Sequence, residues 1–182
     1  MRLFVGIPLA PEVVSELSAV VAKLRSKGDG LRWTTSESWH ITVQFLGNTN
    51  QEHHQCLVAR LAEVRSRSVP VHLGELSFFE RAGIFIADVA PSPELVSLAG
   101  RVTTAVSQCG VVPETRPFHP HVTLARTKDR GRRQSLRALQ KKIHRQPGFS
   151  CFVASEFLLY ESHLSTEGST YEVCHRFPLG VP

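Results

Sequence analysis

The sequence lacks any apolar run long enough to cross a membrane. Its longest hydrophobic stretches have the length of one β-strand, whereas a membrane-spanning helix needs about 20 consecutive apolar residues. The first apolar segment, residues 1–8, is also too short for a secretory signal peptide. We therefore expect a cytoplasmic protein that does not associate with a membrane.

Cysteine is scarce, with four among 182 residues, and no two of them form a Cys-x-x-Cys pair. Isolated cysteines of this kind are typical of reduced and mostly buried side chains. We interpret all four as reduced, which also favours the cytoplasm: Cys56, Cys109, Cys151 and Cys174.

Two phosphate-binding signatures are absent as well. Neither a G-x-x-x-x-G-K-[ST] loop nor a G-x-G-x-x-G loop occurs in the chain. No low-complexity linker divides the sequence. With 42% hydrophobic and 20% charged residues over 182 positions, the composition predicts one globular domain with a core of its own.

Positive charge is present and unevenly placed. The formal net charge is +5, and residues 1–90 contribute none of it, because nine basic residues there balance nine acidic ones. Residues 126–145 hold nine Lys and Arg against one acidic residue, Asp129. On charge pattern alone, this basic segment fits a solvated helix face as well as a surface for a polyanion.

Apolar periodicity predicts alternating strands and helices. Strands are expected over 1–8, 31–34, 40–46, 71–79, 83–89 and 121–125, with a hairpin formed by 149–160 and 170–177. Helices are expected to begin at Pro11 and Pro93, to cover 51–67, and to lie in the basic segment with Leu136, Leu139 and Ile143 inward.

One pattern occurs twice, 81 residues apart. Residues 40–43 (HITV) and 121–124 (HVTL) share the form His-x-Thr-apolar, and Phe4 matches Phe85 at the same offset. We therefore predict two pseudo-repeats, about 1–82 and 83–182, that share one core within residues 1–182. A pseudo-two-fold axis would then bring the two His-x-Thr strands face to face.

The repeated pattern carries acid–base chemistry. Residues i and i+2 of a strand point to the same face, so His40 projects with Thr42 and His121 with Thr123. Two histidines can act near neutral pH as one base and one acid, while two hydroxyls hold phosphate oxygens. We therefore predict phosphoryl transfer that needs neither a metal nor a nucleophilic side chain.

A zinc site is the competing interpretation, because paired histidines also bind metal. The His119-Pro120-His121 sequence is the best argument for it. No cysteine, carboxylate or third histidine lies within either motif, and we expect His119 to point to the face opposite His121 if the strand already begins at residue 119. We therefore predict no metal ligands and no cofactor.

These residues resemble the two-histidine phosphoesterase superfamily, and within it the RNA 2′,3′-cyclic phosphodiesterases, also called 2′-5′ RNA ligases. The resemblance covers nearly the whole chain and is carried by residues 2–7 (RLFVGI), 32–33 (RW), 39–47 (WHITVQFLG), 120–126 (PHVTLAR), 158–162 (LLYES) and 168–171 (GSTY). It implies an α+β fold with two lobes, in which two antiparallel sheets face a central cleft and the helices lie outside.

The resemblance also implies a reaction, in which a terminal 2′,3′-cyclic phosphate of RNA is opened to a 2′-phosphomonoester. By analogy, His121 is the base that activates water and His40 is the acid that protonates the departing 3′ oxygen. Thr42 and Thr123 bind the phosphate. Run in reverse, such a centre has 2′-5′ ligase activity.

Two further residues receive roles by the same analogy. Arg126 matches an arginine after the second motif and adds a positive phosphate contact. It would face away from His121 on a regular strand, so this role requires a bend or strand end near Ala125. Phe45 matches an aromatic side chain that can stack on the terminal base, although a plain core position explains it equally well.

Two other functions remain open from the sequence. One is a phosphodiesterase for another small cyclic phosphate derived from a nucleotide, and the other is an RNA-binding module without catalysis. If the substrate or ligand is RNA, the basic segment holds the body of the RNA. We expect a monomer.

Overall fold

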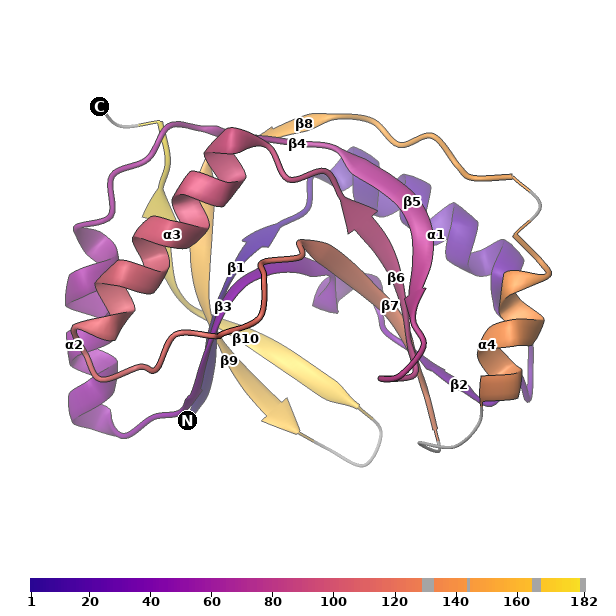
Figure 1. Cartoon of the computed structure of the whole chain (residues 1–182), viewed down its shortest axis with the longest axis horizontal. Coiled ribbons are helices and arrows are strands. Elements are labelled where there is room, and N and C mark those ends of the chain that lie inside the picture. Colours follow the sequence, from indigo (N-terminus) through magenta and orange to yellow (C-terminus); the bar gives the residue numbers. More distant parts are fainter. Residues whose placement is uncertain (129–132, 144, 165–167, 181–182) are drawn as a thin grey trace.

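The computed structural model describes residues 1–128, 133–143, 145–164 and 168–180 (Figure 1). The strands are β1 (Arg2–Pro8), β2 (Leu31–Trp33), β3 (His40–Asn48), β4 (Val69–Val71), β5 (Leu73–Phe79), β6 (Ile84–Val89), β7 (His121–Thr127), β8 (Phe152–Ala154), β9 (Glu156–Leu164) and β10 (Ser169–Pro178). The helices are α1 (Pro11–Leu24), α2 (Gln51–Ala62), α3 (Pro93–Ser107) and α4 (Arg133–Gln140), with a short 3₁₀ helix η1 (Ser36–Ser38).

The helix starts follow the sequence signals. Proline occupies the first turn of α1 and α3, where its missing N–H costs no hydrogen bond. The Ser92 hydroxyl caps α3 and the Asn50 side chain caps α2. Helix α2 is shorter than predicted, because the residues after Val64 lead into β4 instead of continuing the apolar face.

The main sheet has eight strands in the order β10-β9-β1-β3-β7-β6-β5, with β2 added beside β7. Every described ladder in it is antiparallel. One residue pair, Ile41 and Val122, joins the two halves between β3 and β7. The predicted α+β class with antiparallel sheets is confirmed, and the two expected sheets are the two halves on either side of this pair.

The two long strands expected over 71–79 and 149–160 are each divided. Strands β4 and β8 pair with each other in a separate two-stranded sheet. Strands β5 and β9 belong to opposite halves of the main sheet. Each of these chain segments therefore leaves one sheet and enters another, a change of partner that hydrophobic alternation does not reveal.

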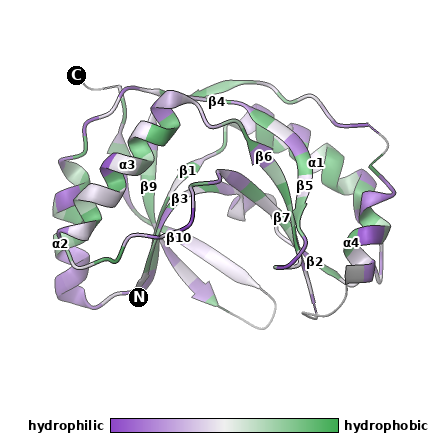
Figure 2. Ribbon diagram, viewed as in Figure 1, coloured by the Kyte–Doolittle hydropathy of each residue, from purple (hydrophilic) through white to green (hydrophobic). Residues whose placement is uncertain are grey.

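The helices cover the outside of the strands. Figure 1 shows α2 and α3 together on one side of the molecule and α1 and α4 on the other. Figure 2 shows hydrophilic residues on their outer surfaces, and Leu17 and Leu98 on the inner faces of α1 and α3 are fully buried. Leu136 and Leu139 of α4 are buried as predicted. Within the described residues, no helix combines the length and apolarity needed to cross a membrane.

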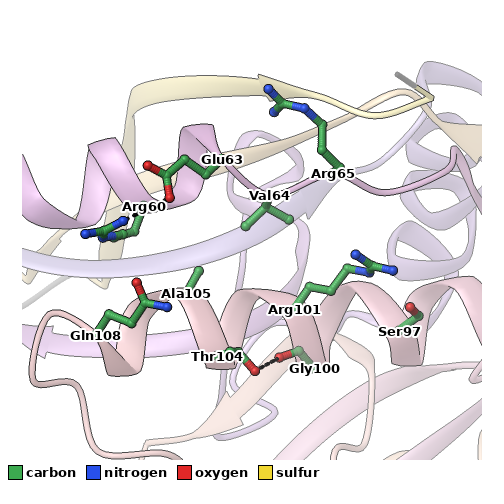
Figure 3. Close-up of a pocket in the computed structure, with 10 residues that line it drawn as sticks. All are labelled: Arg60, Glu63, Val64, Arg65, Ser97, Gly100, Arg101, Thr104, Ala105 and Gln108. Atoms are coloured by element: carbon green, nitrogen blue, oxygen red, sulfur yellow. Dashed lines mark hydrogen bonds and ion pairs between the residues drawn. The ribbon is translucent and has the colours of Figure 1, made fainter. Parts of the chain in front are cut away.

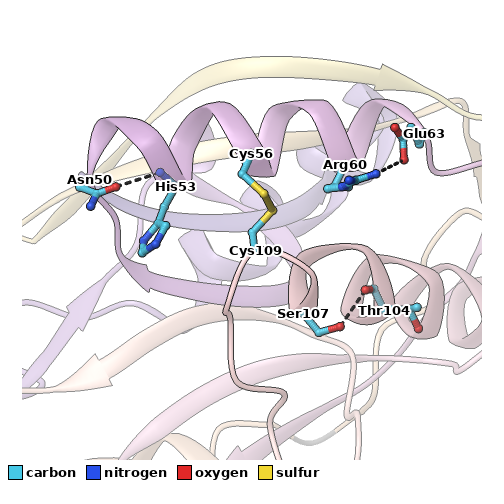
Figure 4. The surroundings of a disulfide bond; sticks show 8 residues. All are labelled: Asn50, His53, Cys56, Arg60, Glu63, Thr104, Ser107 and Cys109. Atoms are coloured by element: carbon cyan, nitrogen blue, oxygen red, sulfur yellow. Dashed lines mark hydrogen bonds and ion pairs between the residues drawn. A yellow bond between two sulfur atoms is a disulfide. The ribbon is translucent and has the colours of Figure 1, made fainter.

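A disulfide corrects the interpretation of the cysteines. Cys56 of α2 is bonded to Cys109 just beyond α3, with Cα atoms 5.9 Å apart (Figure 4). Cys151 and Cys174 are free. The interpretation of all four as reduced is wrong for the first pair, because the packing of α2 on α3 brings together two residues that are 53 positions apart in sequence.

Candidate active site

The two His-x-Thr motifs lie side by side at the centre of the sheet. Ile41 of β3 is directly opposite Val122 of β7, and both side chains are fully buried. Opposed residues in an antiparallel pair point to the same face, so their neighbours in both strands point to the other face. That face therefore carries four half-buried side chains, His40, Thr42, His121 and Thr123, which form the predicted catalytic quartet.

Both histidine rings are held in the same way. The Nδ1 atom of His40 lies 2.8 Å from the Ser38 carbonyl oxygen, and the Nδ1 atom of His121 lies 2.8 Å from the His119 carbonyl oxygen. A carbonyl oxygen can only accept, so each Nδ1 carries a proton and donates it. Each Nε2 is consequently the ring nitrogen that is free to gain a proton, and Nε2 of His40 lies 3.1 Å from the Thr42 hydroxyl.

Burial and neighbouring charge hold both imidazoles toward the neutral form. The pKa of His40 is lowered to about 4, mainly by desolvation and to a smaller extent by the positive charges of His121 and Arg126, while the Ser38 hydrogen bond acts in the opposite direction. Desolvation also lowers the pKa of His121, with smaller contributions from His119 and Arg126. Asp88 and the His119 carbonyl act in the opposite direction on His121.

A β-bulge in each motif strand determines what else reaches this face. Thr42 pairs with Gly6 while Gln44 pairs with Val5, which leaves Val43 as an extra residue in β3. In β7, Leu124 is the extra residue between the partners of Ile86 and Phe85. One extra residue reverses the alternation beyond it.

The two bulges bring Phe45 and Arg126 onto the face of the catalytic quartet. Both residues are exposed, and each follows two consecutive buried positions. The bend that the role of Arg126 requires is thus present, one residue before Ala125. Arg126 also lowers the pKa of both histidines, which requires that its charge lies near them.

The structure separates the aromatic residues that the sequence left ambiguous. Phe45 is 52% exposed, so the core interpretation of this residue is wrong. Trp39 is buried, and its indole N–H donates to the Thr34 hydroxyl. Trp33 is half-buried, contacts Phe85 edge to face, and donates to Asp29. Both tryptophans therefore belong to the packing below the site.

Sequence reasoning missed an aromatic wall around His40. The ring centres of Phe4, Tyr160 and Tyr171 lie 4.6, 5.5 and 5.0 Å from the His40 ring. Phe4 also stacks on Tyr160 at 4.9 Å. These residues come from β1, β9 and β10, so only the strand order could have shown that they converge. The wall supplies much of the apolar environment that lowers the pKa of His40.

His119 lies on the same side as His121, contrary to expectation. The centres of their rings are 6.2 Å apart, and the Phe79 ring contacts both edge to face. Positions 119 and 121 are two residues apart and so share a face where the chain is extended. The partner of His119 is Asp88, 2.8 Å away, and no group of three potential metal ligands occurs within the described ranges.

A groove among the described residues lies away from this face. It has a volume of about 680 Å³ and is formed between α2 and α3, with Arg60, Arg65 and Arg101 among its lining residues (Figure 3). None of its lining residues belongs to the catalytic quartet. The quartet instead lies on the face of the sheet at the junction of β3 and β7, where its four side chains are half-buried.

The fold and the paired motifs define a two-histidine phosphoesterase. The sequence profile of the 2′-5′ RNA ligase superfamily matches residues 11–165, and the chain belongs to that superfamily. The family predicted from the motifs is therefore confirmed. The predicted enzyme class, a hydrolase of phosphodiester bonds, is also confirmed at the level of the family.

Individual relatives support the same assignment. The RNA 2′,3′-cyclic phosphodiesterase of Bacillus subtilis is 27% identical over 97% of this chain and 95% of its own length. The Escherichia coli protein of the same name is 25% identical over 98% and 96%. The crystal structure of E. coli LigT without ligand, 24% identical, superposes with a TM-score of 0.80 over 99% of this chain and 98% of that one. LigT has also been crystallised with 3′-AMP.

Proposed function

We propose that this chain hydrolyses a terminal 2′,3′-cyclic phosphate of RNA to a 2′-phosphomonoester by two-histidine acid–base catalysis. The observation that carries the proposal is the catalytic quartet on one face of two adjacent strands. Two imidazoles, each with Nδ1 fixed and Nε2 available, are what an in-line displacement at phosphorus needs. The names of the curated relatives agree with this substrate class.

The reaction can be written with all atoms balanced. Water attacks phosphorus, and Nε2 of His121 takes the proton that the water loses. The bond from phosphorus to the 3′ oxygen breaks, and Nε2 of His40 gives its proton to that oxygen. Thr42 and Thr123 donate hydrogen bonds to the non-bridging oxygens, and Arg126 balances their charge. The products are a 2′-phosphomonoester and a free 3′ hydroxyl.

The acid role of His40 depends on the substrate. With a pKa of about 4, His40 is neutral at pH 7 in the free protein. A phosphate anion bound at the quartet adds negative charge beside the ring and favours the protonated form. Binding of the cyclic phosphate thus prepares the acid. The reaction passes this proton to the 3′ oxygen and leaves His121 protonated, so His121 must lose a proton and His40 must gain one before the next turnover.

Three alternatives share this centre. Reversal of the same steps joins a 2′,3′-cyclic end to a 5′ hydroxyl, which is 2′-5′ ligation. The exposure of Phe45 supports its proposed stacking on a terminal base, and such a contact also suits a small cyclic nucleotide. An RNA-binding module without catalysis has no need of two fixed Nε2 atoms, so the geometry favours an enzyme.

An assay on a defined RNA end tests the proposal. Purified protein is incubated in EDTA with an oligonucleotide that ends in a 2′,3′-cyclic phosphate, and in parallel with a cyclic mononucleotide. We expect turnover of both, with the 2′ isomer as product. Binding without turnover would favour the RNA-binding module. Activity that EDTA removes and zinc restores would favour the metal interpretation instead.

We further propose a monomer that acts in the cytoplasm as one unit of two pseudo-repeats. The cysteines no longer support this compartment, because a disulfide links α2 to the end of α3. RNA as the substrate is the remaining support. Light scattering of the purified protein measures its mass, and alkylation of thiols in freshly opened cells shows whether Cys56 and Cys109 are bonded there.

A further inference from the structure

The carbonyl groups that orient the two catalytic histidines are held by different means. Ser38 lies in the 3₁₀ helix η1, where its N–H and its hydroxyl both donate to the Thr35 carbonyl. The Ser38 carbonyl that receives Nδ1–H of His40 is therefore fixed by local backbone structure. His119 lies in a less regular segment: residues 111–120 form neither helix nor strand, and the nearest backbone tie is the Pro120 carbonyl, which accepts from the Val89 N–H at 3.1 Å.

The His119 side chain adds a second tie to β6 beside this backbone hydrogen bond. Its Nε2 atom lies 2.8 Å from Oδ1 of Asp88 on β6, and Asp88 is the residue directly opposite His121 in the sheet. The ring of Phe79 contacts His119 at 5.1 Å and His121 at 4.9 Å, edge to face in both cases. Residue 119 is thus attached to the neighbouring strand through its side chain, just where its carbonyl must meet His121.

We propose that Asp88 and His119 are positioning residues for His121: their side-chain hydrogen bond fixes the His119 carbonyl, which in turn keeps the proton of neutral His121 on Nδ1. The consequence for catalysis rests on the function proposed above. If the carbonyl moves, neutral His121 redistributes between its two tautomers, and the fraction with a proton on Nε2 cannot accept one from water.

The pair acts on geometry and contributes little to global stability. The side chains of His119 and Asp88 are 57% and 30% exposed, and ion pairs that exposed stabilise a fold only slightly. Variants at these positions should therefore fold, with melting temperatures lowered by no more than about 2–4 °C. A change at His121 can then be read without interference from unfolding.

The test must distinguish the charge of Asp88 from its hydrogen bond to His119, because four groups act electrostatically around His121. Asp88 of β6 raises its pKa, while His119, Arg126 of β7 and His40 of β3 carry or can carry positive charge beside it. Asp88→Asn keeps an acceptor oxygen for Nε2–H of His119 and removes the negative charge. Asp88→Ala removes both, so the two variants together distinguish the hydrogen bond from the charge.

The test is a ¹⁵N NMR measurement of the His121 ring in protein labelled at histidine, with the signal assigned by its loss in His121→Gln. The spectra are recorded at a pH where the ring is neutral. We expect one Nδ1–H tautomer in the unsubstituted protein and in Asp88→Asn, and a mixture of tautomers in Asp88→Ala and His119→Ala. Glu156→Ala, which breaks an exposed pair with Arg176 on β10, is the matched control and should change nothing.

Kinetics on a cyclic mononucleotide complete the test. Asp88→Ala and His119→Ala should lower kcat about tenfold with little change in KM, and Asp88→Asn should restore most of it. The positioning role is overturned if both alanine variants keep the single tautomer and the original kcat, or if Asp88→Asn behaves as Asp88→Ala. Mixed tautomers in a protein that hydrolyses no cyclic phosphate would contradict the proposed function and leave the positioning role standing.

Discussion

At the level of single residues, His40 and His121 each donate a hydrogen bond to the carbonyl oxygen two residues earlier, but their surroundings differ. His40 lies among the rings of Phe4, Tyr160 and Tyr171, and its pKa falls to about 4. Beside His121 lies Asp88, whose charge opposes the desolvation that lowers the pKa of His121. Asp88 therefore favours the protonated form of His121, whereas both charged neighbours of His40 oppose its protonation.

Removal of either imidazole should abolish most of the turnover. We expect His40→Ala and His121→Ala each to lower kcat on a cyclic mononucleotide by about 100-fold or more, because each removes one proton-transfer group. The double variant should be little worse than either single one, since the two groups act as a unit. Rates from single-turnover assays measure this. A single variant with unchanged turnover would exclude that histidine from catalysis.

The pH dependence of kcat/KM should show that both histidines titrate below the usual pKa of 6.5. Below the pKa values of both rings no base remains, and above both values no acid remains. Both pKa values are lowered from 6.5, that of His40 to about 4. We therefore expect a bell-shaped profile with its maximum below pH 6.5 and a tenfold fall per pH unit on the alkaline side.

Substitution of Arg126 supplies the control for that profile. Its positive charge lowers the pKa of both histidines, so Arg126→Gln should move the whole bell to higher pH while lowering its height. Arg176→Gln, a change of the same charge beside Glu156, should leave the profile in place. A bell that stays fixed in Arg126→Gln would show that this arginine does not act on the histidines.

The quartet itself could be predicted from the sequence, because the two-residue period of a strand is a local property. His40 and Thr42 share a face whatever surrounds them, and the repeat places His121 and Thr123 alike. The tether from His119 to Asp88 could not be predicted. It joins β6 to the segment before β7, and strict alternation indicates only where residue 121 points.

At the level of elements, the bulges in β3 and β7 decide the composition of the site. Regular alternation in β3 would bury Phe45 and expose Gln44, but the structure does the reverse. Gln44 is buried because its amide oxygen accepts from Thr103 of α3 and its amide nitrogen donates to the Phe45 carbonyl. The position of a bulge depends on the partner strand, so the sequence of β3 contained no signal for it.

The disulfide between α2 and α3 should stabilise the protein without affecting chemistry. It closes a loop of 53 residues, and a crosslink of that length typically contributes about 2–4 kcal/mol by restricting the unfolded chain. We expect the double variant Cys56→Ser/Cys109→Ser to melt roughly 4–15 °C lower, with unchanged kcat below the transition. Differential scanning calorimetry measures the difference.

Reductant provides the matched control for the disulfide. Dithiothreitol should lower the melting temperature of the unsubstituted protein toward that of the double variant and should leave the variant itself unaffected. A variant at the free cysteine, Cys151→Ser, should respond to reductant like the unsubstituted protein. If reductant shifts neither protein, the two cysteines do not form a bond in solution.

At the level of the whole molecule, the site exists because two distant parts of the chain share one sheet. A single pair, Ile41 with Val122, connects the half built on β1 and β3 to the half built on β6 and β7. The repeat in the sequence predicted that the motifs would meet. It did not predict the order of the strands, because strands β9 and β10 from the C-terminal end complete the half of the sheet that is built on β1 and β3.

The positions of the basic residues in segment 126–145 lead to a prediction of how the length of an RNA substrate affects the reaction. The basic segment continues from β7 into α4, which packs against β7. Within this segment, the basic residue Arg132 lies outside the described residues, whereas Arg137 and Lys141 are described and their side chains are exposed. Lys142 is already engaged with the Leu24 carbonyl and the Ser26 hydroxyl, so it serves the fold.

Charge reversal at Arg137 of α4 and at Lys141 just beyond it, together the α4 pair, should therefore weaken the reaction of an oligonucleotide and spare that of a mononucleotide. We expect Arg137→Glu/Lys141→Glu to lower kcat/KM on the oligonucleotide and to flatten its decline with salt, by about 0.7 in the logarithmic slope for each phosphate that the protein no longer neutralises. Arg67→Glu/Arg101→Glu changes the net charge equally at exposed positions near α2 and α3. Equal effects of the two double variants would mean that net charge alone attracts RNA. Equal reductions on the oligonucleotide and the mononucleotide would mean that α4 shapes the site. Only a selective effect of the α4 pair on the oligonucleotide supports a surface that holds the body of the RNA.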